Sequence, residues 1–192
     1  MSERIPGTWA RFRGVRIGAV VAIALAVGLV VWLVLRDDDN GSSAGSTTTA
    51  AAAGPVAATP ANLRALSAEL GHPLYWVGSA ANTTYELTRT AGGRVFIRYL
   101  RPGVPLGIRR AAFTIVGTYP VANALGVLRQ LSRKQGEKKL LVPGGGLAVY
   151  STSSPTNVYV AYPGSNLQIE VFDPSPGRAR RLATSGRVVP VG

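Results

Sequence analysis

The sequence predicts an α+β fold: one domain of mainly antiparallel sheet with about three helices, carried behind an N-terminal transmembrane helix and a flexible linker. Three observations support this prediction. Residues 17–35 contain no charged or strongly polar side chain, residues 36–59 are rich in Ser, Thr, Ala and Gly, and residues 60–192 alternate strand patterns with amphipathic helix patterns. Only the last segment has enough large apolar side chains to form a folded core.

Residues 17–35 have the length of a membrane span. At about 1.5 Å per residue they form a helix of about 28 Å, close to the roughly 30 Å thickness of the hydrocarbon layer. Four arginines, Arg4, Arg11, Arg13 and Arg16, precede the segment, and Arg36, Asp37, Asp38 and Asp39 follow it. The positive-inside rule therefore places residues 1–16 in the cytoplasm and residues 36–192 outside the cell membrane.

A cleaved signal peptide is the alternative interpretation of the same basic and apolar pattern. The apolar run is longer than the usual core of a signal peptide, and Arg36 with three aspartates stands where a cleavage site needs small residues. We therefore expect an uncleaved signal anchor in a single-pass protein. Gly18, Ala22 and Ala26 recur at a spacing of four, a pattern that lets two spans approach closely, so homodimerisation through this segment stays open.

Residues 36–59 have too few large apolar side chains to offset the entropy of ordering, so a disordered linker is expected there. The chain has no cysteine, which leaves the domain at 60–192 without disulfides and without a thiolate metal site. The stability of this domain must come from its apolar core.

The first half of the domain is predicted to be one helix followed by four strands. Thr59 is a suitable N-cap, Pro60 suits the first turn, and Gly71 is a suitable stop. The predicted strands are residues 74–77, 83–90, 94–100 and 111–118.

The turn at residues 91–93 fixes the register of the second and third of these strands. A three-residue loop pairs Leu87 with Ile97, which gathers apolar side chains on one face of the sheet. The same register sets Glu86 opposite Arg98 on the other face.

The second half is predicted to repeat this order of elements. The predicted elements are a helix that begins at Tyr119-Pro120 and ends at Gly136, four strands at 139–142, 146–152, 157–162 and 167–172, a basic helix at 176–183, and a strand at 187–191. The order suggests two copies of an αββββ unit packed as a pseudo-dimer, a hypothesis that rests mainly on the similar hairpins 85–100 and 158–172.

The chemical inventory of the domain favours binding over catalysis. Its one histidine and five acids are His72, Glu69, Glu86, Glu137, Glu170 and Asp173. No second histidine or cysteine exists to complete a metal site with His72, so no metal and no cofactor is expected. Glu86 has a predicted partner, Asp173 is expected to cap the last helix, and Glu170 is expected to be a solvated surface residue. No serine lies in a G-x-S-x-G elbow, so no catalytic residue is predicted.

Positive charge dominates the domain. Residues 60–192 carry 13 Arg and 3 Lys against 5 acids, for a net charge of +11. Arginine keeps its charge, and its planar fork fits phosphate and carboxylate oxygens. The predicted anion-binding residues are Arg129, Arg133 and Lys134 at the end of the second helix and Arg178, Arg180 and Arg181 in the third. The alternative is an arginine-rich surface that only contacts water.

The expected partners follow from this charge and from the predicted location. Beside the cell membrane, which the anchor crosses, the anionic ligands at hand are lipid headgroups and wall polymers, and basic side chains near a membrane surface are attracted to them. A protein partner is the other alternative for the ligand of this domain. Nucleic acid is not expected outside the membrane.

Three short segments are informative by their residues: 71–76 (GHPLYW), 85–90 (YELTRT) and 117–120 (GTYP). They resemble an uncharacterised family of bacterial single-pass membrane-anchored proteins with an extracytoplasmic α+β domain. The resemblance covers residue 60 onward and implies the order of anchor, linker and domain, but no activity, catalytic residue or ligand. We therefore expect a membrane-anchored extracytoplasmic binding or interaction module of the cell envelope. An envelope hydrolase acting on a wall or lipid substrate is the alternative.

Overall fold

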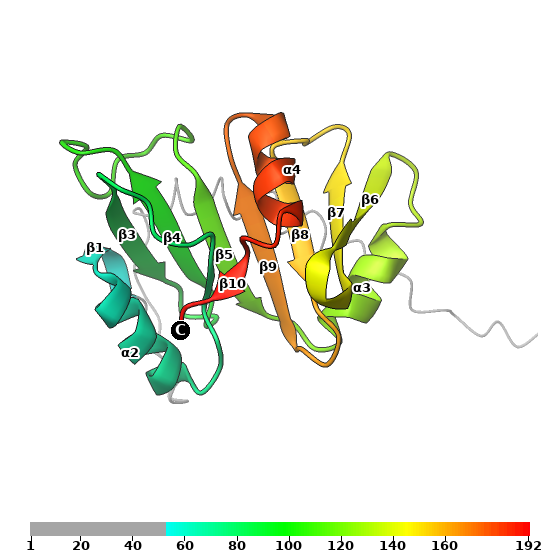
Figure 1. Ribbon diagram of the computed structural model, residues 1–192, viewed down its shortest axis with the longest axis horizontal. Coiled ribbons are helices and arrows are strands. Elements are labelled where there is room, and N and C mark those ends of the chain that lie inside the picture. The colour runs from blue at the N-terminus through cyan, green and yellow to red at the C-terminus, as the bar shows by residue number, and fades with distance from the viewer. Residues whose placement is uncertain (1–52) are drawn as a thin grey trace, which may run out of the picture. The chain divides into compact units, whose positions relative to one another are not determined.

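The computed structural model describes residues 53–192; the predicted cytoplasmic tail (1–16), the transmembrane helix (17–35) and most of the predicted linker lie outside the described residues. The described chain has an α+β fold, as predicted. Its main sheet has eight strands in the order β1-β3-β4-β5-β9-β8-β7-β6, and all neighbouring strands run antiparallel (Figure 1). None of the helices within residues 53–192 has the length and apolarity that a membrane crossing requires.

The strands of the main sheet are β1 (Ala53–Ala58), β3 (Thr84–Arg89), β4 (Val95–Leu100), β5 (Ile115–Pro120), β6 (Glu137–Val142), β7 (Gly146–Ser151), β8 (Asn157–Ala161) and β9 (Leu167–Phe172). Two short strands, β2 (Tyr75–Trp76) and β10 (Val189–Pro190), form a separate antiparallel pair. The helices are α2 (Pro60–Leu70), α3 (Ala124–Leu131) and α4 (Pro176–Thr184), with a short 3-10 turn, η1, at Pro143–Gly145.

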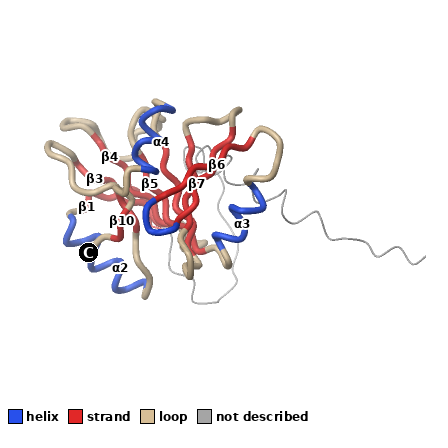
Figure 2. The backbone as a smooth tube through the Cα atoms, turned by 45° about the vertical axis from the view of Figure 1, so that its right-hand side comes forward, coloured by secondary structure: helices blue, strands red, loops and turns tan. Residues whose placement is uncertain are grey.

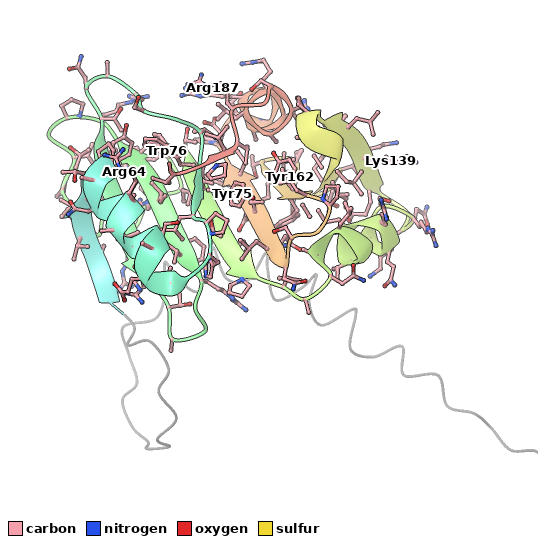
Figure 3. All side chains as sticks on the ribbon, turned by 60° about the horizontal axis from the view of Figure 1, so that its bottom comes forward. Arg64, Tyr75, Trp76, Lys139, Tyr162 and Arg187 are labelled. Carbon is pink, nitrogen blue, oxygen red and sulfur yellow. The ribbon has the colours of Figure 1, made fainter. Side chains whose placement is uncertain are left out.

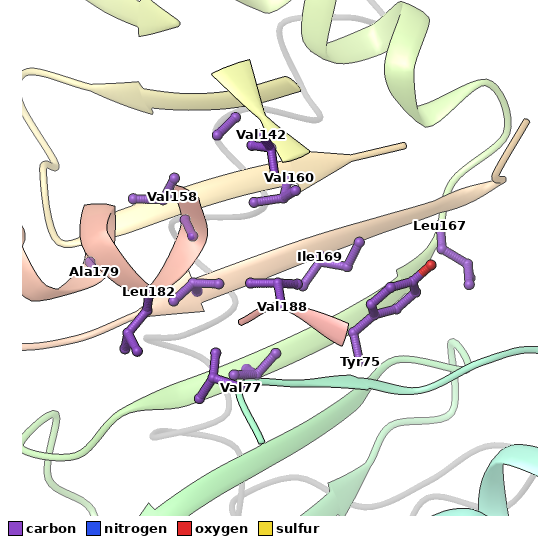
Figure 4. Packing of buried hydrophobic residues seen from close by; sticks show 14 residues of the cluster. Tyr75, Val77, Val142, Val158, Val160, Leu167, Ile169, Ala179, Leu182 and Val188 are labelled. Carbon is purple, nitrogen blue, oxygen red and sulfur yellow. The ribbon is translucent and has the colours of Figure 1, made fainter. Parts of the chain in front are cut away.

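One face of the main sheet carries the larger part of the core. Directly paired residues point to the same face of a sheet. Ile97 pairs with Val116, Val116 with Val171 and Val171 with Val158, and all four side chains are buried. Helix α2 covers this face near β3 and β4, and α4 covers it near β8 and β9. The β2–β10 pair lies between the two helices, and Figure 4 shows the apolar side chains packed there.

The opposite face carries α3 and a long loop. Leu125 and Leu128 of α3 pack against Val149 and Ala161 of β7 and β8. The loop at residues 101–114, which joins β4 to β5, is bound to the β3–β4 end of the same face by side-chain hydrogen bonds. This face also carries Glu86 and Arg98, whose predicted pairing is confirmed, as is that of Leu87 with Ile97.

Strand β1 corrects the predicted end of the linker. The sequence assigns residues 53–58 to the linker, whereas the structure pairs them with β3, with Ala58 opposite Tyr85. An edge strand of small residues is held by backbone hydrogen bonds and needs few large side chains, so its composition gives little sign of a strand. The described fold therefore begins at residue 53, before the predicted start at residue 60.

The second helix is shorter than predicted at both ends. Pro120 still belongs to β5, and the side chain of Asn123 caps α3 by accepting a hydrogen bond from the Gly126 N–H at 3.3 Å. The helix ends five residues before Gly136, whose φ of 84° places it in the turn that leads to β6. The other predicted strands and the helix at 176–183 are present with shifted ends.

The predicted order of one helix and four strands occurs twice, as α2-β2-β3-β4-β5 and as α3-β6-β7-β8-β9. The packing of the two runs differs. Strand β6 belongs to the main sheet, whereas β2 pairs with β10 outside it. Helices α2 and α3 also lie on opposite faces of the main sheet. The helices and first strands of the two runs therefore pack differently, whereas the strand order outward from the central antiparallel β5–β9 pair is the same in both halves of the main sheet, and the duplicated αββββ unit stays a prediction.

Candidate functional site

A cleft of about 320 Å³ lies at the end of the main sheet where β4 and β9 end and β5 begins. Its walls come from three segments: residues 80–83 before β3, the loop at 101–114, and residues 173–178, which follow β9 and include the first turn of α4. Each segment is fixed by buried or half-buried polar side chains.

Two tyrosines fix the segment before β3. The Tyr99 hydroxyl accepts a hydrogen bond from the Val77 N–H at 3.0 Å and donates to the Gly78 carbonyl at 3.2 Å. The Tyr85 hydroxyl accepts from the Ala80 N–H at 2.8 Å, and the two tyrosine rings meet edge-on with centroids 5.2 Å apart. Burial raises the pKa of the Tyr99 hydroxyl, which therefore stays protonated and able to donate.

A buried ion pair fixes the loop at 101–114. The guanidinium of Arg98 lies 2.5 Å from the Glu86 carboxylate, and its other terminal nitrogen donates to the carbonyls of Ile108 and Arg110 at 2.9 and 3.1 Å. The second oxygen of Glu86 accepts the Gly107 N–H at 2.6 Å. Both charged groups therefore hold loop backbone as well as each other.

Asp173 organises the third segment. Its Oδ2 accepts a hydrogen bond from the Thr114 hydroxyl at 2.7 Å and lies 3.3 Å from Nε of Arg178, and its Oδ1 accepts the Ser175 N–H at 2.9 Å. The predicted capping role is therefore correct only in part, because the N-cap residue of α4 is Ser175 and Asp173 fixes the turn before it. The Asp173 side chain is only 6% exposed.

The lining of the cleft combines apolar side chains with two cations. Leu100 is fully buried and Phe113 half-buried, whereas Arg101 and Arg178 are exposed. Asp173 is the only acid among the lining residues, and both of its oxygens already accept hydrogen bonds. Such a site is suited to hold an anionic group by charge-assisted hydrogen bonds rather than to remove a proton from a substrate.

No family model, curated protein or solved structure matches the chain. The resemblance to a family of membrane-anchored proteins therefore stays a prediction. The function has to be inferred from the residues of this chain.

The structure divides the six predicted anion-binding residues into two groups. Arg129, Arg133 and Lys134 belong to α3 and the turn after it, and Arg178, Arg180 and Arg181 belong to α4. Helix α3 packs on the sheet face that holds Ala161, and α4 packs on the face that holds Val160, its neighbour in β8. Neighbours along a strand point to opposite faces. The predicted single patch is therefore not formed, and Figure 2 shows the two helices on different sides of β6 and β7.

Within each group, anion binding stays a prediction. Only Arg178 lines the cleft. The guanidinium of Arg180 lies over the ring of Tyr150, 5.2 Å from its centroid. Basic side chains elsewhere are spread around the domain, and Figure 3 shows Arg64 on α2, Lys139 on β6 and Arg187 after α4.

Glu170 is buried, whereas the sequence predicts a solvated residue. Its side chain is 2% exposed and accepts hydrogen bonds from the hydroxyls of Tyr119 and Tyr159 and from the amide of Asn157. These hydrogen-bond partners among the described residues are all neutral. Burial raises the pKa of Glu170, although its three donors act in the opposite direction. A side chain this enclosed does not meet a ligand.

The sequence contains little sign of the cleft because its walls come from segments far apart in the chain. The glycines and prolines at 102–107 indicate a loop, and Asp173-Pro174-Ser175 indicates a turn. Neither pattern predicts which other segments lie next to it in the fold. The ring nitrogen of His72 makes only a local contact, 3.2 Å from the Pro73 carbonyl. Residues 53–192 contain no cluster of three or more His, Cys, Asp or Glu side chains suited to a metal ion.

Proposed function

We propose that the chain is a single-pass, N-in signal-anchor protein of the bacterial cell envelope, whose C-terminal domain is a non-catalytic binding module outside the cell membrane. The anchor is supported by the uncharged run at 17–35 and by the charge asymmetry across it. The segment at 36–52 reaches at most about 60 Å when fully extended, so the domain stays near the membrane surface. Homodimerisation through Gly18, Ala22 and Ala26 stays a prediction.

The cleft with its two exposed arginines is the observation that carries the binding role. The acids of the domain favour the same conclusion because each already has a partner. Glu69 pairs with Arg89, Glu86 with Arg98 and Asp173 with Arg178, Glu170 accepts three neutral donors, and Glu137 has a hydrogen bond with Ser151. A general acid or base has to exchange a proton with its substrate. None of these carboxylates is placed to do so.

An envelope hydrolase is the alternative function, and one contact favours it. The Thr114 hydroxyl lies in the cleft and donates to the Asp173 carboxylate, as a nucleophile donates to its base. However, Thr114 is buried, and Asp173 also accepts from Ser175 and Arg178. Incubation of the full-length protein with wall fragments and membrane lipids separates the two functions. We expect no product to be released, whereas release that Thr114→Val abolishes would establish the hydrolase.

Fusion of alkaline phosphatase after Gly192 tests the topology. The enzyme folds only outside the cytoplasm, so we expect an active fusion in cells, and an inactive one beside an active cytoplasmic reporter at the same position would refute the orientation. A mature N-terminus between residues 36 and 52 would indicate cleavage and refute the anchor.

A further inference from the structure

The charges that line the cleft leave one positive charge unbalanced. Arg101 and Arg178 contribute two cations, and Asp173 contributes the only anion. The described part of the chain offers the Arg101 guanidinium no hydrogen bond and no ion pair. A ligand with a single negative charge is therefore the one that leaves the cleft neutral.

The two arginines are placed differently. Arg178 is oriented by Asp173 through its Nε, which leaves its terminal nitrogens available, and its side chain is 61% exposed. Arg101 follows directly after β4, where the loop is held by the Glu86–Arg98 pair. One guanidinium is thus fixed and the other is free to turn toward a ligand.

Two separate guanidiniums favour a phosphate group over a carboxylate. A carboxylate has two oxygens in one plane and is satisfied by the fork of a single arginine, whereas the oxygens of a tetrahedral phosphate point apart. A phosphodiester carries one charge, and its ester substituents have apolar surface that suits the half-buried Phe113 in the lining of the cleft. A phosphate monoester carries close to two charges and would leave negative charge beside Asp173.

We infer that the cleft binds a phosphodiester monoanion between Arg101 and Arg178. This inference rests on the proposed function, because membrane phospholipids and the glycerol phosphate polymers of bacterial walls both present this group outside the cell membrane. The shared chemistry is the diester, and the tests below separate the two sources.

The test uses full-length protein in a neutral detergent at low salt, titrated calorimetrically with glycerophosphoglycerol. We expect saturable binding with one site per chain. Arg101→Gln should weaken it about tenfold, equivalent to about 1.4 kcal/mol. Lys139→Gln is the matched control, because Lys139 is exposed on β6, outside the cleft, and its loss changes the net charge equally. We expect the control to retain wild-type affinity.

Three results would overturn the assignment. The first is no saturable binding at millimolar ligand, and the second is an affinity that Arg101→Gln leaves unchanged. The third is tighter binding of glycerol 3-phosphate or acetate than of the diester. Because purified protein is titrated, such a failure is separate from a failure of the predicted topology.

A second titration identifies the source of the diester. Soluble polyglycerol phosphate competes with glycerophosphoglycerol if the ligand is a wall polymer. Nanodiscs that contain phosphatidylglycerol compete if the ligand is a lipid headgroup, and phosphatidylcholine nanodiscs, whose phosphodiester is balanced by the choline cation, should compete more weakly. Competition by either supports the diester. Failure of both, at concentrations where glycerophosphoglycerol binds, would contradict it.

Discussion

Two carboxylate–guanidinium pairs near the same end of the domain are used in different ways. In the Glu86–Arg98 pair the side chains are 1% and 8% exposed. Arg98 Nη2 and the second oxygen of Glu86 bind the backbone of the loop at 101–114, whereas the buried Arg98 Nε has no hydrogen-bond partner among the described residues. In the Asp173–Arg178 pair the carboxylate is buried, but the arginine side chain is 61% exposed. We call the Glu86–Arg98 pair the closed pair, because both of its side chains are buried. We call the Asp173–Arg178 pair the open pair, because its arginine presents a cation to the cleft.

The difference shows that an ion pair by itself does not mark a site. When both partners are buried, removal of either one leaves an unpaired charge inside the protein, which lowers the stability of the fold. When only the carboxylate is buried, it orients the arginine side chain, and the exposed guanidinium can still bind a ligand. Both pairs serve the cleft, one by holding a wall and the other by lining it.

The largest expected effect comes from breaking the closed pair. Arg98→Met leaves Glu86 buried without its cation and releases two loop carbonyls, so we expect a loss of about 3–5 kcal/mol in the free energy of unfolding. Urea unfolding of the full-length protein in detergent, followed by circular dichroism, measures it. The double variant Glu86→Gln/Arg98→Met should recover part of the loss. A loss below about 1 kcal/mol would show that the pair behaves like an exposed one.

A smaller effect is expected from the open pair. Asp173→Asn removes the charge that orients Arg178 and weakens the bond from the Thr114 hydroxyl, for an expected loss of about 1–2 kcal/mol in the same assay. Glu69→Gln is the matched control, because Glu69 also pairs with an arginine, Arg89, but has a side chain that is 63% exposed. The control should cost less than about 0.5 kcal/mol. Equal losses in the two variants would remove the distinction between buried and exposed acids.

The smallest expected effect is a change of the free energy of unfolding with pH. It comes from Glu170, the buried acid whose hydrogen-bond donors are all neutral. Because burial raises the pKa of Glu170 above its ordinary value of 4.5, the folded protein binds this proton more tightly than the unfolded chain does. The free energy of unfolding should therefore fall as the pH rises from about 4.5 through the raised pKa. Unfolding of wild type and Glu170→Gln at a series of pH values isolates this contribution. The wild type should lose stability relative to the variant as the pH rises, and the opposite trend would assign Glu170 a lowered pKa.

Local patterns in the sequence predicted much of the sheet. The three-residue turn and the alternation of apolar side chains were sufficient to pair Leu87 with Ile97 and Glu86 with Arg98, because register within a hairpin depends on near neighbours. Strand β1 was missed because its small side chains carry no apolar signal. The start of α3 was placed too early because Tyr119-Pro120 resembles a helix start, whereas strand pairing with β9 extends through Pro120.

The site was harder to predict because it depends on contacts between distant segments. Glu170 stands in an alternating strand pattern that normally indicates an exposed residue, and only its tyrosine and asparagine neighbours from β5 and β8 make its burial acceptable. The prediction of one basic patch failed for a similar reason, since charge in a sequence does not reveal the sheet face that a helix covers. Arg178 was predicted from its charge, whereas Arg101 was not.

One labelling experiment tests the external binding module most directly. The chain has no native cysteine, so Ala112→Cys on the cleft and Ser154→Cys in the turn after β7 each introduce a single thiol at an exposed position. In intact cells treated with a membrane-impermeant maleimide, we expect both variants to be labelled. Added glycerophosphoglycerol should slow labelling of the Ala112→Cys variant only. Labelling that requires permeabilised cells would contradict the external location, and equal slowing of both variants, or slowing of neither, would contradict binding in the cleft.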